Sequence, residues 1–271
     1  MRFYNTSLTP LMPARKPKSP PVVLSIAGYD PSSGAGITAD LKTIAAHRCY
    51  GISCITALTV QSTRGVRRVQ PVAAPTIAET LQELARDFKV AAIKIGMLGS
   101  LEAARAVSAF VERNRKVPVV LDPVIRSSSG AALVSPRGLN FMRNIVPLAT
   151  VITPNLDEAA ALAGFPVRTR EDMQQAADAL RAMGARAVII TGGHLNPPLD
   201  LLALEKRSVW LHGKHIKTRS THGTGCAFST ALACNLALGR SMEAAARAAK
   251  SFVEHALKTA PKVGKGNGPV I

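Results

Sequence analysis

The segment THGTGCAFSTALACNL, residues 221–236, holds the side chains with the clearest chemical potential. Gly223 and Gly225 flank Thr224, and Cys226 follows at the start of a predicted alanine-rich helix. Exposed N–H groups at a helix N-terminus form a site for anions, because they carry partial positive charge. The same location stabilises a thiolate, so we expect a lowered pKa for Cys226. An anion site beside a base is what phosphoryl transfer to an alcohol requires.

A cysteine nucleophile is the competing interpretation of this segment. Nucleophilic cysteines in acyl transfer need a histidine and an orienting amide as partners. His222 is the only imidazole next to Cys226, and no nearby histidine and asparagine pair in acyl-transfer order supports a nucleophile. The pattern therefore favours a base over a nucleophile.

The elements that must position this segment alternate between two patterns. Short apolar runs, each followed by an amphipathic stretch, are typical of a parallel sheet covered by helices on both faces. Strands are predicted at residues 22–30, 53–61, 90–98, 116–125, 149–155 and 186–193, and helices at 32–47, 74–88, 100–115 and 170–184. The expected fold class is α/β, a three-layer α/β/α sandwich.

Unusual residues gather where these strands end. They are Gly28, Asp30, Gln61, Lys94, Met97, Asp122, Asn155, Glu158, Gly192 and Gly193. In open parallel sheets, ligands bind at the carboxyl edge of the strands. The pattern thus locates a site without defining its chemistry.

Each of the other short motifs also has a purely structural interpretation. GYDPSSGAGI (28–37) is an ordinary strand-to-helix turn, and it matches neither a Walker loop nor the GxGxxG fingerprint. LDPV (121–124) is consistent with a strand that ends at a proline. In TPNLDEA (153–159), Asn155 is a helix cap, with Asp157 and Glu158 favourable at the positive end of the helix dipole.

Composition and charge limit the remaining classes of function. The chain has 271 residues, 47% of them hydrophobic, and a formal net charge of +17. Residues 1–21 carry four basic and no acidic side chains, so we expect a flexible basic tail, 1–21, before a single domain, 22–271. Without the tail the charge is 17 minus 4, or +13, and no nucleic-acid-binding motif accompanies it. Nucleic acid is therefore not expected as a partner.

Cysteine spacing and hydropathy indicate the cellular compartment in which we expect the protein. The four cysteines, Cys49, Cys54, Cys226 and Cys234, form no CxxC pair and no ligand-spaced cluster, so neither a zinc site nor a disulfide scaffold is predicted. No stretch reaches the roughly 18 apolar residues of a membrane span, and the tail lacks a signal-peptide core. We expect a cytoplasmic protein without a membrane partner.

Seven motifs in order resemble one family. They are GYDPSSGAGITADLKT, ITALTVQSTRGV, IKIGML, VLDPVI, ITPNLDEA, GGH and THGTGC, within a stretch from about residue 22 to 270. Their order and spacing are similar to those of the hydroxymethylpyrimidine/phosphomethylpyrimidine kinases of thiamine biosynthesis, in the ribokinase-like superfamily. Seven ordered motifs are far more specific than any one of them.

The resemblance implies a fold, a reaction and a set of site residues. The reaction is ATP- and Mg²⁺-dependent phosphorylation of 4-amino-5-hydroxymethyl-2-methylpyrimidine, and then of its monophosphate to the pyrophosphate, by a homodimer. The resemblance implies that Cys226 is the base and that Gly223, Thr224 and Gly225 form the anion hole. It implies a substrate pocket lined by Gly28, Asp40, Gln61 and Met97. Near ATP it places Asn155, Glu158, Thr191 and Gly193, with Asp122 and Glu158 near the metal, partly through water, and residues 200–219 beside the adenine. The amide of Gln61 suits an aminopyrimidine edge because it both donates and accepts.

Three positions depart from the family pattern. Thr191 stands where the family commonly has lysine, and a threonine supplies only a hydroxyl to the triphosphate. By position, Lys94 and Arg126 are candidates to replace that charge. Tyr29 stands where a small residue is usual, and Ser220 where asparagine is frequent.

Two alternatives remain open at this point. A pyridoxal-type vitamin kinase of the same superfamily acts on a similar hydroxymethyl group, and Gln61 and Met97 favour the pyrimidine over it. A non-catalytic nucleic-acid binder is favoured only by the charge, and it predicts steep salt dependence and no effect of Cys226→Ala.

Overall fold

The computed structural model describes residues 19–127, 130, 133–193 and 195–271, and the fold is built on one sheet of nine strands within those residues. The strand order is β3-β2-β1-β4-β5-β6-β7-β8-β9. The bounds are β1 Val22–Tyr29, β2 Tyr50–Ser62, β3 Gly65–Pro71, β4 Val90–Ile95, β5 Val119–Leu121, β6 Val151–Ile152, β7 Val188–Ile190, β8 Leu199–Ala203 and β9 Ser208–His212. Most of the tail predicted at 1–21 lies outside the described residues.

The strand directions show where the sheet is parallel. β2, β1, β4, β5, β6 and β7 pair in parallel, whereas β3, β8 and β9 add antiparallel ribbons at the two edges. β1 lies between β2 and β4, so the chain order runs outward from it in both directions. Such a switch point opens a crevice beyond the carboxyl ends of the strands.

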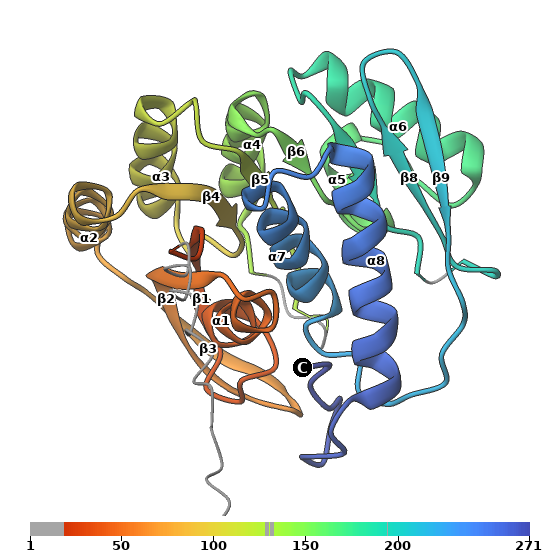
Figure 1. Ribbon diagram of the computed structural model, residues 1–271, viewed down its shortest axis with the longest axis horizontal. Coiled ribbons are helices and arrows are strands. Elements are labelled where there is room, and N and C mark those ends of the chain that lie inside the picture. The colour runs from red at the N-terminus through yellow and green to blue at the C-terminus, as the bar shows by residue number, and fades with distance from the viewer. Residues whose placement is uncertain (1–18, 128–129, 131–132, 194) are drawn as a thin grey trace, which may run out of the picture.

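Helices cover both faces of the sheet, as Figure 1 shows, and this confirms the predicted three-layer sandwich. Their bounds are α1 Gly36–Ala46, α2 Ala74–Asp87, α3 Leu101–Arg113, α4 Pro136–Ile145, η1 Val146–Leu148, α5 Leu156–Ala163, α6 Arg170–Ala182, α7 Thr224–Ala237 and α8 Met242–Thr259. One apolar core contains residues of α2 to α6, and the other contains residues of α1, α7 and α8. The two cores therefore lie on opposite faces.

Local sequence explains why these elements form. The interior of β1 is buried from Val23 to Gly28, as expected of a strand covered on both faces. Helix α5 begins with a capping box in which Asn155 accepts from the Glu158 N–H and Glu158 accepts from the Asn155 N–H. Helix α7 is apolar on nearly all sides and is buried over most of its length between α1, α8 and the sheet. Its N-terminus is thus fixed by packing.

The predicted strands are in the right places, but several are shorter than expected. The candidates at 116–125, 149–155 and 186–193 contain strands of only three, two and three residues. The predicted residues that follow these short strands lie in loops at the carboxyl edge. The sequence pattern does not predict β3, β8 and β9. No helix among the described residues has the length and apolar character needed to cross a membrane.

Candidate active site

The start of helix α7 lies against the turn at residues 30–35, which connects β1 to α1. Gly223 caps the helix with φ +84°, and a Cβ there would lie 1.8 Å from the carbonyl oxygen of Gly34. Glycine is required for this close approach. Gly225, in contrast, faces open space, because a methyl group on its Cα would meet no atom within 4 Å. The backbone at Gly225 is therefore open, just beyond the contact of Gly223 with Gly34.

Thr224 stabilises this helix start. Its Oγ1 donates to the carbonyl oxygen of Thr221 at 2.7 Å, and Ala227 N–H donates to the Gly223 carbonyl at 2.8 Å. Between them, the N–H groups of Gly225 and Cys226 belong to the first turn, which has no intrahelical acceptors for them. This helix start is the segment in which the sequence predicts an anion site.

Cys226 is partly buried among charged groups, and its pKa is not lowered as the sequence predicts. Burial raises the pKa of Cys226 to about 12, although the nearby Lys94 charge acts to lower it. Asp122 and Asp40 oppose Lys94 and raise the pKa further. The expectation of a low pKa is wrong for the ligand-free chain because desolvation outweighs the helix terminus.

Lys94 is fully buried, and its Nζ donates to Asp40 Oδ2 at 2.9 Å. Burial acts against its charge, but attraction to Asp40, Cys226 and Asp122 raises the pKa of Lys94 above its ordinary value. Asp40 also accepts from Ser25 Oγ and Thr230 Oγ1, at 2.5 and 2.7 Å. With no exposed surface, Asp40 stands behind the pocket wall and does not line it, in contrast to the prediction.

Of the two candidates for the missing family lysine, Lys94 and Arg126, Lys94 has no free charge to supply. Lys94 lies under Cys226 and is committed to Asp40. Arg126 is exposed and donates to the carbonyl oxygen of Gly130 at 3.3 Å. The suggestion that Lys94 replaces the lysine is therefore wrong in position, since a fully buried ammonium cannot contact a bound nucleotide.

Asp122 directly follows β5 and Glu158 lies in the first turn of α5, and the two carboxyl groups form an acidic pair. Asp122 accepts from Ser229 Oγ of α7 at 3.0 Å and lies 3.9 Å from Lys94 Nζ. Burial raises the pKa of Asp122, and burial together with the Asp122 charge raises the pKa of Glu158 to about 8. Two carboxylates that disfavour each other's charge would be relieved by a cation.

The donor set agrees with a magnesium ion held mainly by water. Within the described part of the chain, no three His, Cys, Asp or Glu side chains are grouped closely enough to hold a metal. Mg²⁺ usually keeps several waters and takes one or two protein carboxylates. Asp122 and Glu158 therefore fit the group without forming a cage for it.

The predicted nucleotide residues lie at the neighbouring strand ends. Asn155 and Thr191 form a parallel bridge, and Thr191 N–H donates to the Pro154 carbonyl at 2.9 Å. Gly193 is exposed, with open space around its Cα. Asp200, which follows in β8, accepts from Gly192 N–H and pairs with Lys250 Nζ at 2.6 Å. His194 of the GGH motif lies outside the described residues.

The predicted substrate residues Gly28 and Met97 lie together. A Cβ on Gly28 would be 3.1 Å from Met97 Sδ, so the methionine side chain packs closely against the glycine. Gln61, at the end of β2, turns instead toward His222, with its amide nitrogen 3.1 Å from His222 Nε2. Gln61 and His222 line one small cavity with Ser62, Thr63, Gly65, Ser127 and Asn267.

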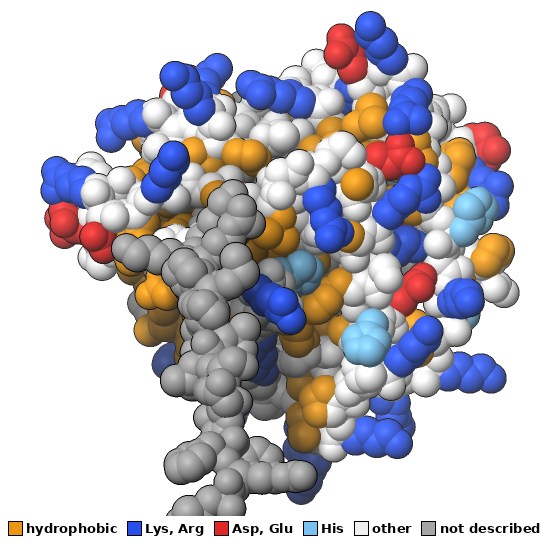
Figure 2. Space-filling model, in the orientation of Figure 1, with side chains coloured by type: hydrophobic (Ala, Val, Ile, Leu, Met, Phe, Trp, Pro, Cys, Tyr) orange, Lys and Arg blue, Asp and Glu red, His pale blue; other side chains and the backbone are white. Residues whose placement is uncertain are grey.

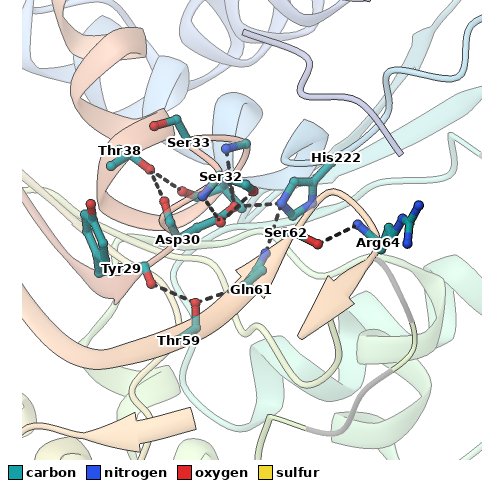
Figure 3. A network of polar contacts seen from close by, with 12 residues as sticks. Tyr29, Asp30, Ser32, Ser33, Thr38, Thr59, Gln61, Ser62, Arg64 and His222 are labelled. Atoms are coloured by element: carbon teal, nitrogen blue, oxygen red, sulfur yellow. Dashed lines mark hydrogen bonds and ion pairs between the residues drawn. The ribbon is translucent and has the colours of Figure 1, made fainter. Parts of the chain in front are cut away.

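The structure adds a polar network that the sequence does not predict. His222 Nε2 lies 2.7 Å from Asp30 Oδ2, and Figure 3 shows the two side chains and Gln61 pointing toward one another. In the sequence, Asp30 stands out only as a strand-end residue, and His222 only as a neighbour of Cys226. Both are buried polar residues, but 192 positions separate them, so no local pattern signals the contact.

Related proteins share this sequence over most of its length. A model of the family described as phosphomethylpyrimidine kinase matches residues 30–271. The hydroxymethylpyrimidine/phosphomethylpyrimidine kinase of Streptomyces coelicolor is 41% identical over 256 residues, which cover 94% of this chain and 95% of that protein. The relationship thus extends over nearly the full length of both chains.

Solved structures give the same picture. The phosphomethylpyrimidine kinase of Clostridium difficile has a TM-score of 0.79 and 32% identity, and the match covers 88% of this chain and 99% of that one. The pyridoxal kinase of Staphylococcus aureus, solved with pyridoxal, has a TM-score of 0.86 and 34% identity, with 94% of each chain covered. Other structures of the Staphylococcus aureus enzyme hold ADP or AMP-PCP.

Proposed function

This chain belongs to the phosphomethylpyrimidine kinase family, and we propose that it transfers the γ-phosphoryl group of ATP to 4-amino-5-hydroxymethyl-2-methylpyrimidine and then to the monophosphate. The observation that carries the proposal is the start of α7, where open N–H groups meet Cys226, Lys94 and Asp122. Such a site stabilises the charge of a transferring phosphoryl group and takes up the proton of the accepting hydroxyl.

Cys226 acts as the base in this proposal. The substrate hydroxyl gives its proton to the Sγ thiolate as its oxygen bonds to the γ-phosphorus, and the bond from phosphorus to the ADP oxygen breaks. In the ligand-free chain the thiol keeps its proton, because burial raises its pKa to about 12. Lys94 is the neighbouring charge that favours the thiolate, so we assign it to positioning and electrostatic support of Cys226.

The N–H groups of the α7 first turn form the anion hole. Gly223 permits the close contact with Gly34, and Gly225 leaves the approach open. Asn155, Thr191 and Gly193 contact the triphosphate, and the β8–β9 region, 200–219, flanks the adenine. Gly28, Met97 and Gln61 bind the heterocycle. Asp40 contributes indirectly, by holding Lys94.

Asp122 and Glu158 would hold Mg²⁺, in part through water. The ion would neutralise phosphate charge when bound. Glu158 must lose its proton to serve, since metal-binding carboxylates are deprotonated. Homodimer formation and a cytoplasmic location are part of the same proposal and rest on the family relationship alone.

Pyridoxal is the second candidate substrate. Pyridoxal kinases are among the solved structures with high similarity, at a TM-score of 0.86 for the Staphylococcus aureus enzyme. Both substrates present a hydroxymethyl group on a flat nitrogen heterocycle. The amide of Gln61 favours the aminopyrimidine because that edge offers both a donor and an acceptor.

The test is product analysis by mass spectrometry with ATP and Mg²⁺, offering the pyrimidine alcohol and pyridoxal separately. We expect mono- and diphosphorylated pyrimidine from wild type, and a loss of about 10²- to 10⁴-fold in rate for Cys226→Ala, the range for removal of a general base. Cys54→Ala, which removes a buried thiol of β2, is the matched control and keeps activity. Turnover of pyridoxal alone would assign the chain to the second candidate, and full activity of Cys226→Ala would exclude the base.

A further inference from the structure

Three distant segments meet at the imidazole of His222. Asp30 follows β1, Gln61 ends β2, and His222 precedes α7; Figure 3 shows their side chains converging. His222 Nε2 lies 2.7 Å from Asp30 Oδ2 and 3.1 Å from the Gln61 amide nitrogen. A single ring nitrogen therefore serves two polar partners.

The carboxylate of Asp30 is held in place by several hydrogen bonds that it accepts. Its carboxylate accepts from Ser32 N–H, Ser32 Oγ, Gly34 N–H and Ala35 N–H, at 2.8, 2.7, 3.2 and 2.9 Å. Although burial acts in the other direction, hydrogen bonds from His222 and Ser32 lower the pKa of Asp30. An ionised carboxylate only accepts hydrogen bonds, so His222 Nε2 carries a proton and donates it to Asp30.

That proton decides how Gln61 must face. A protonated imidazole nitrogen has no lone pair with which to accept an amide N–H. The contact at 3.1 Å is favourable only when the Gln61 amide turns its oxygen toward His222. The nitrogen end then faces Thr59 Oγ1, the atom that lies 3.2 Å from the other end of the amide.

Thr59 completes the chain of donors in this orientation. Its Oγ1 donates to the carbonyl oxygen of Tyr29 at 2.9 Å and can accept from the Gln61 nitrogen. One Gln61 N–H then donates to Thr59, and Thr59 donates to Tyr29. In the opposite orientation two N–H groups would face each other, which costs a buried hydrogen bond.

The backbone holds the imidazole in place. A Cβ on Gly34 would lie 2.1 Å from His222 Cδ2, so the ring packs directly on the glycine. His222 N–H donates to the Gly268 carbonyl, and Val270 N–H donates to the His222 carbonyl, both at 3.0 Å. His222 thus has little freedom to move away from Gln61.

We propose that His222, held by Asp30, is a positioning residue that fixes the Gln61 amide with its oxygen toward the imidazole, and that this orientation selects a substrate with an amine beside its hydroxymethyl group. The inference rests on the proposed function. The second lone pair of the amide oxygen accepts from the exocyclic amine, and the second N–H donates to the adjacent ring nitrogen. A substrate without that amine leaves the second lone pair of the fixed oxygen without a donor, and such a site discriminates against that substrate.

The experiment compares the pyrimidine alcohol with its analogue in which hydrogen replaces the amine. The measured quantity is the ratio of kcat/KM for the two alcohols. We expect wild type to prefer the amine by about 100-fold or more, and His222→Phe to reduce that preference by about tenfold or more, chiefly through KM of the amine substrate. His255→Phe, at an exposed histidine of α8, is the matched control and keeps the wild-type ratio.

A double-mutant cycle separates positioning from a general structural role. In the Gln61→Ala background, His222→Phe has no amide to orient, so it should leave the ratio unchanged. Equal losses on both alcohols in the single variant, or a change of ratio that persists without Gln61, would overturn the inference. Thr59→Val, which removes the partner at the other end of the amide, should lower the ratio in the same direction as His222→Phe.

The outcome for wild type distinguishes the proposed function from the role of His222. If wild type phosphorylates neither alcohol, the proposed function fails, and the inference fails with it. If wild type turns over the pyrimidine alcohol but His222→Phe keeps the full preference for the amine, only the inference fails.

Discussion

At the scale of single residues, the state of Cys226 decides when the base is available. Its surroundings combine burial, which disfavours a thiolate, with the Lys94 charge, which favours it. Burial is the larger cause, and the pKa is raised to about 12. The ligand-free chain therefore holds a neutral thiol, and the proposed role as base requires bound ligands to lower this pKa.

Alkylation tests this state directly. Because iodoacetamide reacts with thiolates, we expect Cys226 of the folded, ligand-free chain to react slowly at pH 7 and steadily faster up to pH 10. Peptide mass spectrometry measures the rate, with the urea-unfolded chain as reference. Cys49, Cys54 and Cys234 are buried and serve as internal controls that stay unmodified in the folded chain. Labelling at pH 7 as fast as in the unfolded chain would contradict the raised pKa.

Glu158 provides a second prediction, for stability against pH. Its pKa in the folded chain is about 8, against an ordinary 4.5, because burial and the Asp122 charge disfavour ionisation. The folded chain thus binds a proton that the unfolded chain has lost between these values, and stability falls as pH rises through this window. Glu158→Gln resembles the protonated form and does not titrate.

Thermal melts at pH 5 and pH 9 give the measurement. Relative to wild type, we expect the Tm of Glu158→Gln to rise between pH 5 and pH 9, by about 2–4 °C for each kcal/mol of linkage. Glu171→Gln, at an exposed acid in the first turn of α6, is the control without this trend. A Tm difference between wild type and Glu158→Gln that is the same at both pH values would show that Glu158 ionises normally.

At the scale of elements, the start of α7 contains two glycines, of which the fold tolerates a side chain at one and not at the other. Gly223 has φ +84° and touches the Gly34 carbonyl, whereas a methyl at Gly225 would meet nothing within 4 Å. Gly223→Ala is expected to lower Tm by about 5 °C or more, from backbone strain and the clash. Gly225→Ala is expected to keep or slightly raise Tm, since alanine is the better helix former by about 1 kcal/mol.

Activity should separate the pair in the other direction. The methyl of Gly225→Ala would occupy the approach to the helix N–H groups, so we expect a loss of about tenfold or more in kcat/KM for ATP in a stable protein. Steady-state kinetics with varied ATP and melting curves on the same samples provide both readings. Normal ATP kinetics for Gly225→Ala would place the phosphates elsewhere.

The strands of the sheet differ in how well the sequence predicts them. Residues 22–30 and 90–98 are recognisable as strands because burial on both faces leaves continuous apolar runs. The edge strand Gly65–Pro71 escapes prediction because GVRRVQP is largely exposed and has no apolar periodicity. The strand bounds at 151–152 and 188–190 depend on pairing with neighbours, which a local pattern does not contain.

For the site, local motifs predict positions better than partners. The cap at Asn155 and the helix start at Thr224 are encoded within a few residues, and both are as predicted. The pairs formed by Lys94 with Asp40, and by His222 with Asp30, join residues 54 and 192 positions apart. The sign of the Cys226 pKa shift follows from burial by such distant segments, so the sequence indicates the wrong direction.

At the scale of the whole molecule, the net charge of +17 is the feature that the kinase chemistry does not require. On the face shown in Figure 2, Lys and Arg side chains are scattered over many elements and form no continuous stripe. Several are paired locally, such as Arg247 with Glu243 and Lys250 with Asp200. A dispersed charge attracts polyanions without a defined register.

This distribution predicts non-specific, salt-sensitive association with polynucleotides. We expect detectable binding of single-stranded DNA at about 20 mM salt and, near physiological salt, a Kd no tighter than about 10⁻⁶ M, because counterion release supplies all of the affinity. Fluorescence anisotropy measures the salt slope, and the kinase assay with DNA added tests for competition. Cys226→Ala should bind DNA as wild type does, since the attraction lies outside the site. Saturable nanomolar binding that survives about 150 mM salt, or DNA that competes with ATP, would instead mean that the charge forms a dedicated nucleic-acid surface.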